Sequence, residues 1–523
     1  MKRVVKEGGS LESISNRLRE MQGAVSGTLV LCVIAFAVVS SVGGVLNGSL
    51  YARVAEYCGI ARELSTLTTC VLYLALFFVA TRKPSLLDRR LLTVTALGCA
   101  VTAMLVLEFA LMLGHGPASV VGFVFSSTAS AWGTILLVCA LGSLRSPMAA
   151  LMGVMLGAAL GEVARVLHPE VPYEVGIVEV TACYALVIVL MYRPAGKKLD
   201  GIACGSAPAS LELANPESFL GPSHALFLCA LLFNVATGYG LTLNEVAHAP
   251  ASVDVSALVL VGVAAYMLLA GGKGKEDARF SFAVLLVVAG FIVAPFTFVT
   301  GASSANALLR IGVRCFDMLV WLVVLAVGRR NAFALLPTFA LVRSMAALGT
   351  DVGAVAGHTT NDIVGTNSDA AMLIAEVVLF AFVAFLWLGF RKFSFTDTIQ
   401  GVVGVSAPTT ADVPERAHGD GAASAAVANA PMLDANPSEG AAMPPASPSI
   451  EERCFALGTA RGLTERETEI FAMLARGRNG QFVMDHYVVS RNTVKSHVKH
   501  IYAKLDVHSQ QELIDLVERT GNA

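Results

Sequence analysis

The chain has 523 residues, of which 55% are hydrophobic and only 15% charged, and its mean hydropathy is +0.67. A soluble protein averages about 25% charged residues, so this composition excludes a soluble enzyme, a disordered chain and a disulfide scaffold. It indicates a membrane protein. The net charge of −2 points to no polyanionic partner for the chain as a whole. The ten cysteines form no CxxC pair, so we expect no metal site, no cofactor and no disulfide framework.

Twelve apolar runs approach or exceed the roughly 20 residues that a membrane span needs. They lie at 24–46, 64–80, 91–113, 119–142, 147–167, 174–192, 223–246, 252–271, 280–300, 306–328, 332–350 and 369–390. The first run is too long for a cleaved signal peptide and another run follows it directly. The longest internal connection, 193–222, divides the twelve into six and six. We therefore predict an all-α membrane domain over 1–392.

Basic residues in the connections predict the orientation of these spans. The N-terminal segment, the even-numbered connections and the segment after the last span hold 20 Lys and Arg, whereas the odd-numbered connections hold only Arg53 and Arg62. Because cytoplasmic connections are enriched in Lys and Arg, both termini are predicted to be cytoplasmic. The expected location is the cell inner (cytoplasmic) membrane, as a multi-pass protein.

Two six-span halves around a centre resemble the major facilitator superfamily, and that resemblance implies a central cavity. The family usually carries Gly-x-x-x-Asp-Arg-x-Gly-Arg-Arg between its second and third spans. Here only Asp88, Arg89 and Arg90 remain, and they also fit an ordinary basic cytoplasmic connection. Three glycines spaced four apart, Gly153, Gly157 and Gly161, predict close helix packing inside the bundle.

Ionisable and polar side chains inside the spans are candidate ligand-pocket residues, because charges at membrane depth usually face a cavity or a partner. They are Glu108, Glu162, Arg165, Glu179, Asn234, Arg310, Arg314, Asp317, Arg343 and Glu376. The candidates in spans one to six are mostly acidic, and those in spans seven to twelve are mostly basic. The planar guanidinium of Arg is suited to binding a carboxylate. The hypothesis is a small organic ligand of unknown identity, an anion, near the arginines. The alternative is that Glu162–Arg165 and Arg314–Asp317 only neutralise each other.

A soluble module is predicted after a tether. Residues 393–450 are rich in Ala, Pro, Gly and Ser and predict a flexible cytoplasmic linker. Over 451–523 the pattern predicts four helices: one capped by Thr464 and Glu467, one at 480–487, one from Ser490 to about 504, and one capped by Ser509 and Glu512. The apolar faces expected for the first, third and last of them are Ile470, Phe471 and Leu474; Val494, Val498, Ile501 and Leu505; and Leu513, Ile514 and Leu516. This is helix-turn-helix organisation.

The third predicted helix suits the major groove of DNA. Residues 491–504 hold Arg491, Lys495, Lys499 and Lys504 with two histidines and no acid, although the module as a whole has ten basic and ten acidic residues. A recognition helix needs cations toward the DNA and apolar residues toward its own core. A solvated basic helix is the alternative that charge alone leaves open.

Four segments of the module closely resemble the LuxR/FixJ family of DNA-binding domains: LTERETE at 463–469, LARG at 474–477, SRNTVKSHV at 490–498 and IYAKLDVHS at 501–509. The resemblance implies that Lys495, Ser496 and Lys499 face base edges. It implies that Thr493, His497 and Lys504 approach the DNA backbone. The last helix, here 509–518, commonly pairs two domains on a two-fold site.

This module also departs from the family pattern in its second helix. Gly480 to Met484 replaces the usual Asn-Lys-Glu-Ile-Ala, Tyr487 replaces Leu, and Gln510 replaces Arg. We expect the scaffold helix to be repacked, with a weaker phosphate contact there.

The leading hypothesis is a membrane-bound one-component transcription regulator whose membrane domain senses a small ligand. Its C-terminal domain binds promoter DNA, as a dimer, and RNA polymerase is a candidate partner. The alternative is a transporter with an added DNA-binding regulatory domain. No nucleophile motif, phosphate loop or metal constellation supports an enzyme, so we expect no catalytic residues.

Overall fold

The computed structural model of the protein describes residues 15–205, 219–242, 255–269, 276–300, 304–364, 368–390, 394–395, 397–398, 449–478, 480–487, 489 and 491–520. The chain divides into two compact units. The first holds every described helix up to residue 390, and the second holds those from residue 450 onward. Most of the predicted tether over 393–450 lies outside the described residues.

A helix stands at each of the twelve predicted runs. They are α2 (Gly27–Val45), α4 (Ala61–Arg82), α5 (Arg89–Leu113), α6 (Gly116–Gly142), α7 (Pro147–Leu167), α8 (Tyr173–Cys204), α10 (Ala225–Thr242), α11 (Val255–Leu269), α12 (Glu276–Thr300), α13 (Ser304–Arg330), α14 (Leu335–Val364) and α15 (Ser368–Phe390). Within the described part of the chain, nine of them are long and apolar enough to cross a membrane. The protein is therefore a multi-pass membrane protein, and α11, α12 and α15 remain predicted spans.

Short elements connect some of these helices. They are η1 (Leu46–Tyr51), a π-helical turn that leads into α3 (Ala52–Ala55), and the 3-10 turns η2 (Pro84–Leu86) and η5 (Ala332–Ala334).

The connection between α4 and α5 has defined structural roles. Asp88 is the N-cap of α5, and its carboxylate accepts the N–H groups of Leu91 and Arg90, which hold its pKa below the usual value. Arg89 makes two hydrogen bonds to the carboxylate of Asp200 on α8, at 3.1 and 3.0 Å. At least Asp88 and Arg89 therefore do more than mark the cytoplasmic side.

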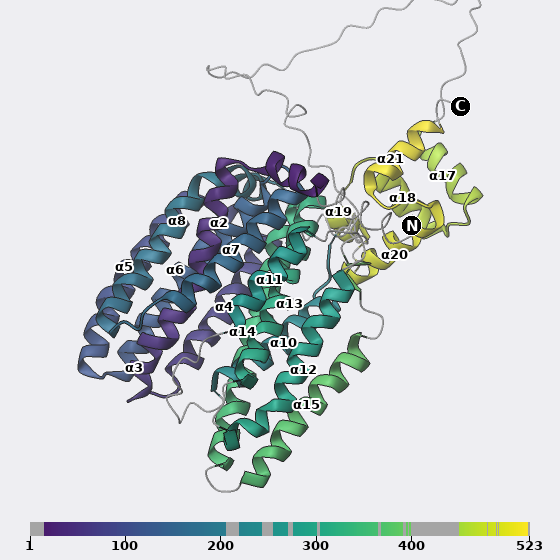
Figure 1. Ribbon diagram of the computed structural model, residues 1–523. Coiled ribbons are helices and arrows are strands. Elements are labelled where there is room, and N and C mark those ends of the chain that lie inside the picture. The colour runs from purple at the N-terminus through teal and green to yellow at the C-terminus, as the bar shows by residue number, and fades with distance from the viewer. Residues whose placement is uncertain are drawn as a thin grey trace, which may run out of the picture. The chain divides into compact units, whose positions relative to one another are not determined.

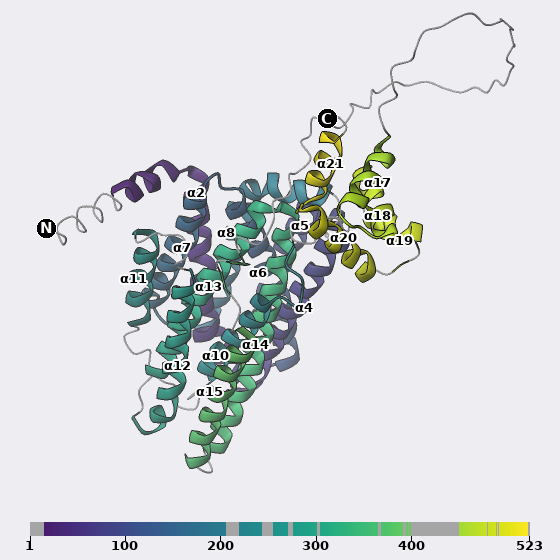
Figure 2. The same cartoon turned by 90° about the vertical axis from the view of Figure 1, so that its right-hand side faces the viewer.

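Helix pairing repeats between the two halves, which Figure 1 colours purple to blue and teal to green and Figure 2 shows from another side. In the first half α2 packs on α7, and α5 packs on α6 and α8. In the second half the corresponding helices do the same: α10 packs on α14, and α12 packs on α13 and α15. The halves meet through α4 with α14 and α7 with α11. This is the two-half bundle expected from the resemblance to the major facilitator superfamily.

Glycines allow the closest of these contacts. A Cβ on Gly157 of α7 would lie 2.5 Å from the Cβ of Phe36 on α2, and one on Gly161 would lie 2.7 Å from the carbonyl oxygen of Ala37. The predicted close packing of this glycine series inside the bundle is confirmed. The second half uses the same device, because a Cβ on Gly353 of α14 would lie 2.0 Å from the carbonyl oxygen of Val235 on α10.

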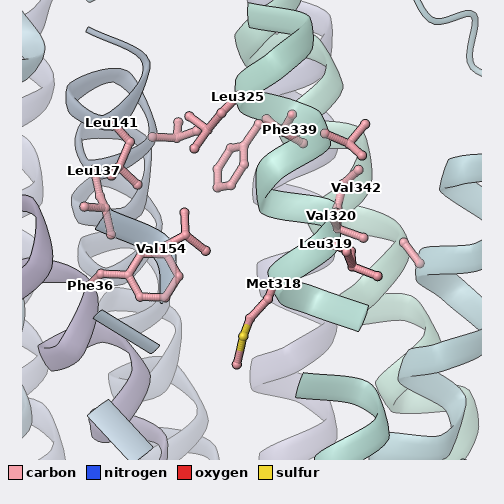
Figure 3. Packing of buried hydrophobic residues seen from close by; sticks show 14 of the residues in the cluster. Phe36, Leu137, Leu141, Val154, Met318, Leu319, Val320, Leu325, Phe339 and Val342 are labelled. Carbon is pink, nitrogen blue, oxygen red and sulfur yellow. The ribbon is translucent and has the colours of Figure 1, made fainter. Parts of the chain in front are cut away.

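The bundle interior joins side chains from both halves, as Figure 3 shows for Phe36 and Val154 on one side and Met318 and Phe339 on the other. The ring of Trp321 on α13 lies 5.0 Å from that of Phe36 and 5.2 Å from that of Phe339. Such aromatic pairs add to the free energy of area burial. Phe36 and Trp321 of this group also line the cavity described below.

Hydrogen bonds also join the halves at the end where α6 and α13 finish. Lys198 of α8 donates to the carbonyl of Gly328 at 3.0 Å. Arg329 donates to the carbonyls of Leu144 and Ser146 at 3.0 and 2.6 Å. The two halves are thus held together at their predicted cytoplasmic end.

The C-terminal domain contains α17 (Ile450–Ala460), α18 (Glu465–Ala475), α19 (Gly480–Tyr487), α20 (Arg491–Leu505) and α21 (Gln510–Arg519). The sequence predicted four helices, and α17 is a fifth among the described residues. It starts with a capping box between Ser449 and Glu452, and its Cys454 is fully buried in the domain core. This helix was missed because its first residues follow directly on the Ala- and Pro-rich segment.

We expect Gly157→Ala to lower the thermal unfolding midpoint of the detergent-solubilised chain, because overpacking costs about 1–3 kcal/mol. The control is Gly43→Ala on α2, where a Cβ would meet nothing within 4 Å. Equal midpoints for the two variants would contradict the packing described for α2 and α7.

Candidate functional site

The first candidate site is the helix-turn-helix surface of the C-terminal domain. The predicted capping box is confirmed: Thr464 accepts the N–H of Glu467, and Glu467 accepts the N–H of Thr464. The apolar face of α18 is buried as predicted, with Ile470, Phe471 and Leu474 at most 1% exposed. These contacts fix the scaffold on which α20 rests.

The inner face of α20 is also as predicted. Val494, Val498, Ile501 and Leu505 are at most 2% exposed. Of the six predicted DNA-contacting side chains, four are exposed and two are half-buried. The exposed ones are Thr493, Ser496, Lys499 and Lys504, and the half-buried ones are Lys495 and His497. The cap predicted at Ser490 lies outside the described residues.

Lys504 has a role inside the domain. Its Nζ lies 2.7 Å from Oε2 of Glu467 on α18 and donates to the carbonyl oxygen of Gly462 at 3.0 Å. His500, one turn earlier on α20, has Nδ1 3.8 Å from Oε1 of the same carboxylate. In the free protein Lys504 therefore ties the end of α20 to the start of α18. Its phosphate contact remains a prediction.

Glu467 is a buried carboxylate whose charge is stabilised locally. Burial raises its pKa, but hydrogen bonds from Lys504 and Thr464 outweigh burial and lower the pKa to about 2. The carboxylate is therefore ionised at every physiological pH. This ion pair was not anticipated, although the residues of the capping box were.

The departures from the family pattern have visible structural consequences. Tyr487 of α19 lies under the guanidinium of Arg466, 3.5 Å from ring to cation. Gln510 donates to the carbonyls of Leu474 and Arg478 at 2.9 and 3.0 Å, and so closes the end of α18. Both departures thus make defined contacts with α18 or the residues beside it, and the expected repacking and weaker phosphate contact remain predictions.

The last helix, α21, differs from prediction in two details. Ser509 accepts the N–H of Glu512, but the Glu512 carboxylate accepts the N–H of His508, so only half of the expected capping box forms. Its core side chains are Leu513 and Val517, spaced four apart, whereas Ile514 and Leu516 were predicted in place of Val517 and are half-buried.

The second candidate site is a cavity of about 110 Å³ inside the bundle. Its apolar wall is formed by α2, α7, α11 and α13, including Phe36 and Trp321. Its ionisable lining consists of Glu162 of α7, Arg314 and Asp317 of α13, and Arg343 of α14. A smaller adjoining void is lined by Asn234, Asp317 and Arg343. Five of the ten predicted pocket residues therefore meet at one place.

The charges in this cavity are partly paired. Arg165 bonds to Oε1 of Glu162 at 2.5 Å, and Glu162 is only 2% exposed. Arg314 and Asp317 lie 4.0 Å apart, a long distance for an ion pair. Arg343 has its guanidinium 6.0 Å from the ring of Tyr73, and its buried Nε has no hydrogen-bond partner. The lining itself holds two arginines and two carboxylates. Arg165, which does not line the cavity, adds one positive charge beside it through its pair with Glu162.

Other predicted pocket residues lie near this cavity or away from it. Arg310 is one turn from Arg314 on α13 and acts electrostatically on Glu162. Glu179 pairs with His168 at 2.7 Å instead of lining the cavity. Glu108 on α5 and Glu376 on α15 are exposed. The depth of a residue in the membrane did not distinguish cavity-lining residues from the others. Which face of a helix points outward is known only when its neighbouring helices are known.

Sequence reasoning missed a polar cluster where α4 meets α14. His358 lies 3.2 Å from a carboxylate oxygen of Glu63, which also pairs with Arg62 at 3.1 Å. Both carboxylate oxygens of Asp351 are buried without a hydrogen-bond partner. The apolar run predicted for this span stops at residue 350, whereas α14 continues to Val364.

The start of the predicted linker is docked on the bundle. Phe395 is fully buried, with its ring 5.1 Å from that of Phe280 and 6.2 Å from that of Phe316. Asp277 of α12 accepts the N–H of Phe395 at 2.7 Å and the hydroxyl of Ser394 at 2.9 Å. Phe316 is the residue before Asp317, so the docking point adjoins the cavity along α13.

Comparison with known proteins identifies the C-terminal domain. Residues 461–517 match the model of the family described as bacterial regulatory proteins, luxR family. The domain is therefore a LuxR-type helix-turn-helix that binds DNA, as the sequence predicted.

Two curated relatives are similar over the same domain. The chain is 42% identical over 59 residues to the uncharacterized response regulatory protein YgeK of Escherichia coli (strain K12). It is 38% identical over 66 residues to the transcriptional activator protein ExaE of Pseudomonas putida. These matches cover 11% and 12% of this chain and 40% and 31% of the relatives.

The bundle is similar to two solved transporter structures at low identity. One is the human organic anion transporter MFSD10 (TETRAN), at 14% identity and a TM-score of 0.44. The other is a bacterial homologue of the iron transporter ferroportin in an outward-facing state with soaked iron, at 11% and 0.48. Each similarity covers 70% of this chain and 99% of the other. Neither carries an inference about what this bundle binds.

We expect Glu467→Gln to destabilise the C-terminal domain, expressed as 449–523, by about 2 kcal/mol at pH 7 in urea unfolding. The lowered pKa of Glu467 means that its stabilisation is present above about 4.5 and is lost as pH falls toward about 2. The difference between wild type and variant should therefore shrink across that window. Glu469→Gln, which removes an exposed pair with Arg466, is the control. A difference that is constant from pH 7 to pH 3 would contradict the assignment.

Proposed function

We propose that this chain, a LuxR-type DNA-binding domain fused to a multi-span membrane bundle, is a membrane-bound one-component transcription regulator. The observation that carries the proposal is the luxR-family match at 461–517 in the same chain as the bundle and its charged cavity. The bundle senses a small ligand, and the C-terminal domain binds promoter DNA in the cytoplasm. Both termini lie on the cytoplasmic side of the inner membrane.

The input is a small organic anion in the central cavity. The lining has as many arginines as carboxylates, and Arg165 beside it pairs with Glu162 and leaves one positive charge in excess over the group as a whole. A cation away from water needs an anionic partner. Arg343 offers a planar fork that suits a carboxylate, and the walls formed by Phe36 and Trp321 suit an apolar body. A small carboxylic acid fits this lining, and the residues Glu162 and Asp317 limit it to one net negative charge.

The signal leaves the bundle along α13. An anion between Arg314 and Arg343 competes with Asp317 for the same guanidinium groups, because Arg314 and Asp317 lie 4.0 Å apart. A shift of Asp317 moves Phe316, whose ring stacks on Phe233 at 4.0 Å and contacts Phe395. Release of Phe395 lengthens the tether of the DNA-binding domain and changes its effective concentration for a second domain.

The output is pairing of two C-terminal domains on a two-fold site through 509–518, with RNA polymerase as a candidate further partner. LuxR-type domains bind operators better as pairs, so ligand-controlled pairing is the preferred mechanism. A longer flexible tether does not fix the orientation of the DNA-binding domain. This property is compatible with pairing of two domains and not with a rigid lever.

A transporter with an added DNA-binding regulatory domain is the alternative function. The repeated pairing of α2 with α7 and α10 with α14 favours it, since inverted or parallel repeats around a central site are typical of transporters. Uptake of labelled ligand into vesicles by the chain without residues 393–523 separates the two functions. Saturable uptake supports transport, and binding without uptake supports sensing.

We expect Lys495→Ala with Lys499→Ala to weaken operator binding by more than 30-fold, because each base-edge contact contributes about 1–3 kcal/mol. Fluorescence anisotropy with operator DNA at fixed salt measures it. Arg461→Ala, an exposed basic residue before α18, is the matched control. Unchanged operator affinity in the double variant would show that α20 does not face the DNA.

We expect Arg343→Ala and Phe395→Ala to fail at different steps. A panel of small carboxylates is first screened for thermal stabilisation of the wild-type chain. Arg343→Ala should weaken binding of the stabilising acid about 10- to 100-fold, since a bond to a charged group contributes about 1.5–3 kcal/mol. Phe395→Ala should bind it normally but lose the transcriptional response.

Phe385→Ala on α15, where the side chain is 53% exposed, is the control for loss of a phenylalanine. A response to every inducer that survives both Arg314→Ala and Arg343→Ala would contradict the cavity as the ligand site. A normal response in Phe395→Ala would contradict the route along α13.

A further inference from the structure

A groove of about 670 Å³ lies on the outer surface of the first half, between α2, α5 and α8. Residue Leu31 of α2, residues 90 and 93–94 of α5, and residues 188–190 and 192–194 of α8 line it. It is about six times larger than the central cavity and shares no residue with it. No part of the proposed ligand response uses it.

One end of this groove is basic. The side chains of Arg90 and Arg193 line it, and both residues are exposed. The neighbouring Arg89 is different, because it is bound to Asp200, donates to the carbonyl of Tyr192 and stacks over the Tyr192 ring at 4.4 Å. Arg89 therefore holds Tyr192 in the groove wall, and the two other arginines are the cations that face outward.

The rest of the groove is apolar. Val94 and Val189 are 70% and 63% exposed. The other lining residues are Leu31, Thr93, Ile188, Leu190, Tyr192 and Pro194. Val94 and Val189 each lie four residues, about one helical turn, further along the span from Arg90 and Arg193. A charged end at the predicted cytoplasmic surface thus continues into an apolar slot at membrane depth.

We propose that this groove binds one anionic phospholipid of the cytoplasmic leaflet, with its phosphate between Arg90 and Arg193 and an acyl chain along Val94 and Val189. The occupant follows from charge complementarity: the two cations lie at the end of the bundle that the basic residues of the even-numbered connections predict to be cytoplasmic, where anionic lipids gather. Basic pockets between spanning helices at this surface bind anionic headgroups. The site is independent of the proposed regulatory function.

Native mass spectrometry of the full chain, taken from vesicles of phosphatidylglycerol and phosphatidylcholine, tests the proposal. The wild-type chain should retain phosphatidylglycerol over phosphatidylcholine. Arg90→Ala with Arg193→Ala should lower that preference about 30-fold, which corresponds to about 1 kcal/mol for each arginine. Val94→Trp, which fills the slot and leaves the charges in place, should lower the number of retained lipids of both kinds.

The matched control is Arg82→Ala with Arg145→Ala, two exposed arginines of the same predicted surface that do not line the groove. An equal loss of phosphatidylglycerol preference in this control would mean that any basic surface attracts the lipid. That result would overturn the proposed site. Lack of preference in the wild type, or an unchanged preference in Arg90→Ala with Arg193→Ala, would also overturn the proposal.

Discussion

The cost of placing charge inside an apolar bundle is the constraint on which the rest of this structure depends. Arginine stays charged in a protein, so each guanidinium at membrane depth needs an acceptor or a polarisable neighbour. Arg165 has Glu162 at 2.5 Å, whereas Arg314 has Asp317 only at 4.0 Å. Arg343 has the ring of Tyr73 and an unsatisfied Nε. The incomplete pairing is located at one cavity, and this is why we propose that cavity as the ligand site.

Helix α13 connects this electrostatic constraint to the start of the predicted linker. Arg314 and Asp317 line the cavity, Phe316 contacts the docked Phe395, and Arg329 bonds to the opposite half at the end of the same helix. One helix thus carries the charges, the tether contact and a bond between the halves. This is why the proposed signal route from the cavity to the tether follows α13.

Many of the helices and caps could be predicted from the sequence, because the spacing of apolar residues and the capping residues are local properties of the chain. The twelve helix positions, the buried face of α20 and the Thr464–Glu467 box follow from apolar spacing and residue type. The helix α17 could have been found from Ser449 and Glu452, which form a second capping box. The DNA-binding module was identified from its long sequence motif, because its charge alone is also compatible with an ordinary solvated helix.

The remaining features depend on neighbours that sequence spacing does not specify. Glu108 and Glu162 look alike in sequence, yet one is exposed on α5 and the other is buried against α13. Phe395 follows the last span in a stretch without apolar period, so nothing local indicates that it docks. Lys504 was expected to face DNA, but the carboxylate that holds it lies 37 residues earlier.

In the proposed mechanism the bundle controls the DNA-binding domain through the ligand cavity. Genome-wide DNA occupancy of the full chain is compared with that of residues 449–523 expressed alone, in cells with and without the carboxylate that stabilises the purified protein. We expect the carboxylate to change the DNA occupancy of the full chain and to leave that of the free domain constant. If the full chain and the free domain respond in the same way to the carboxylate, or if neither responds, the bundle does not control the DNA-binding domain through the cavity.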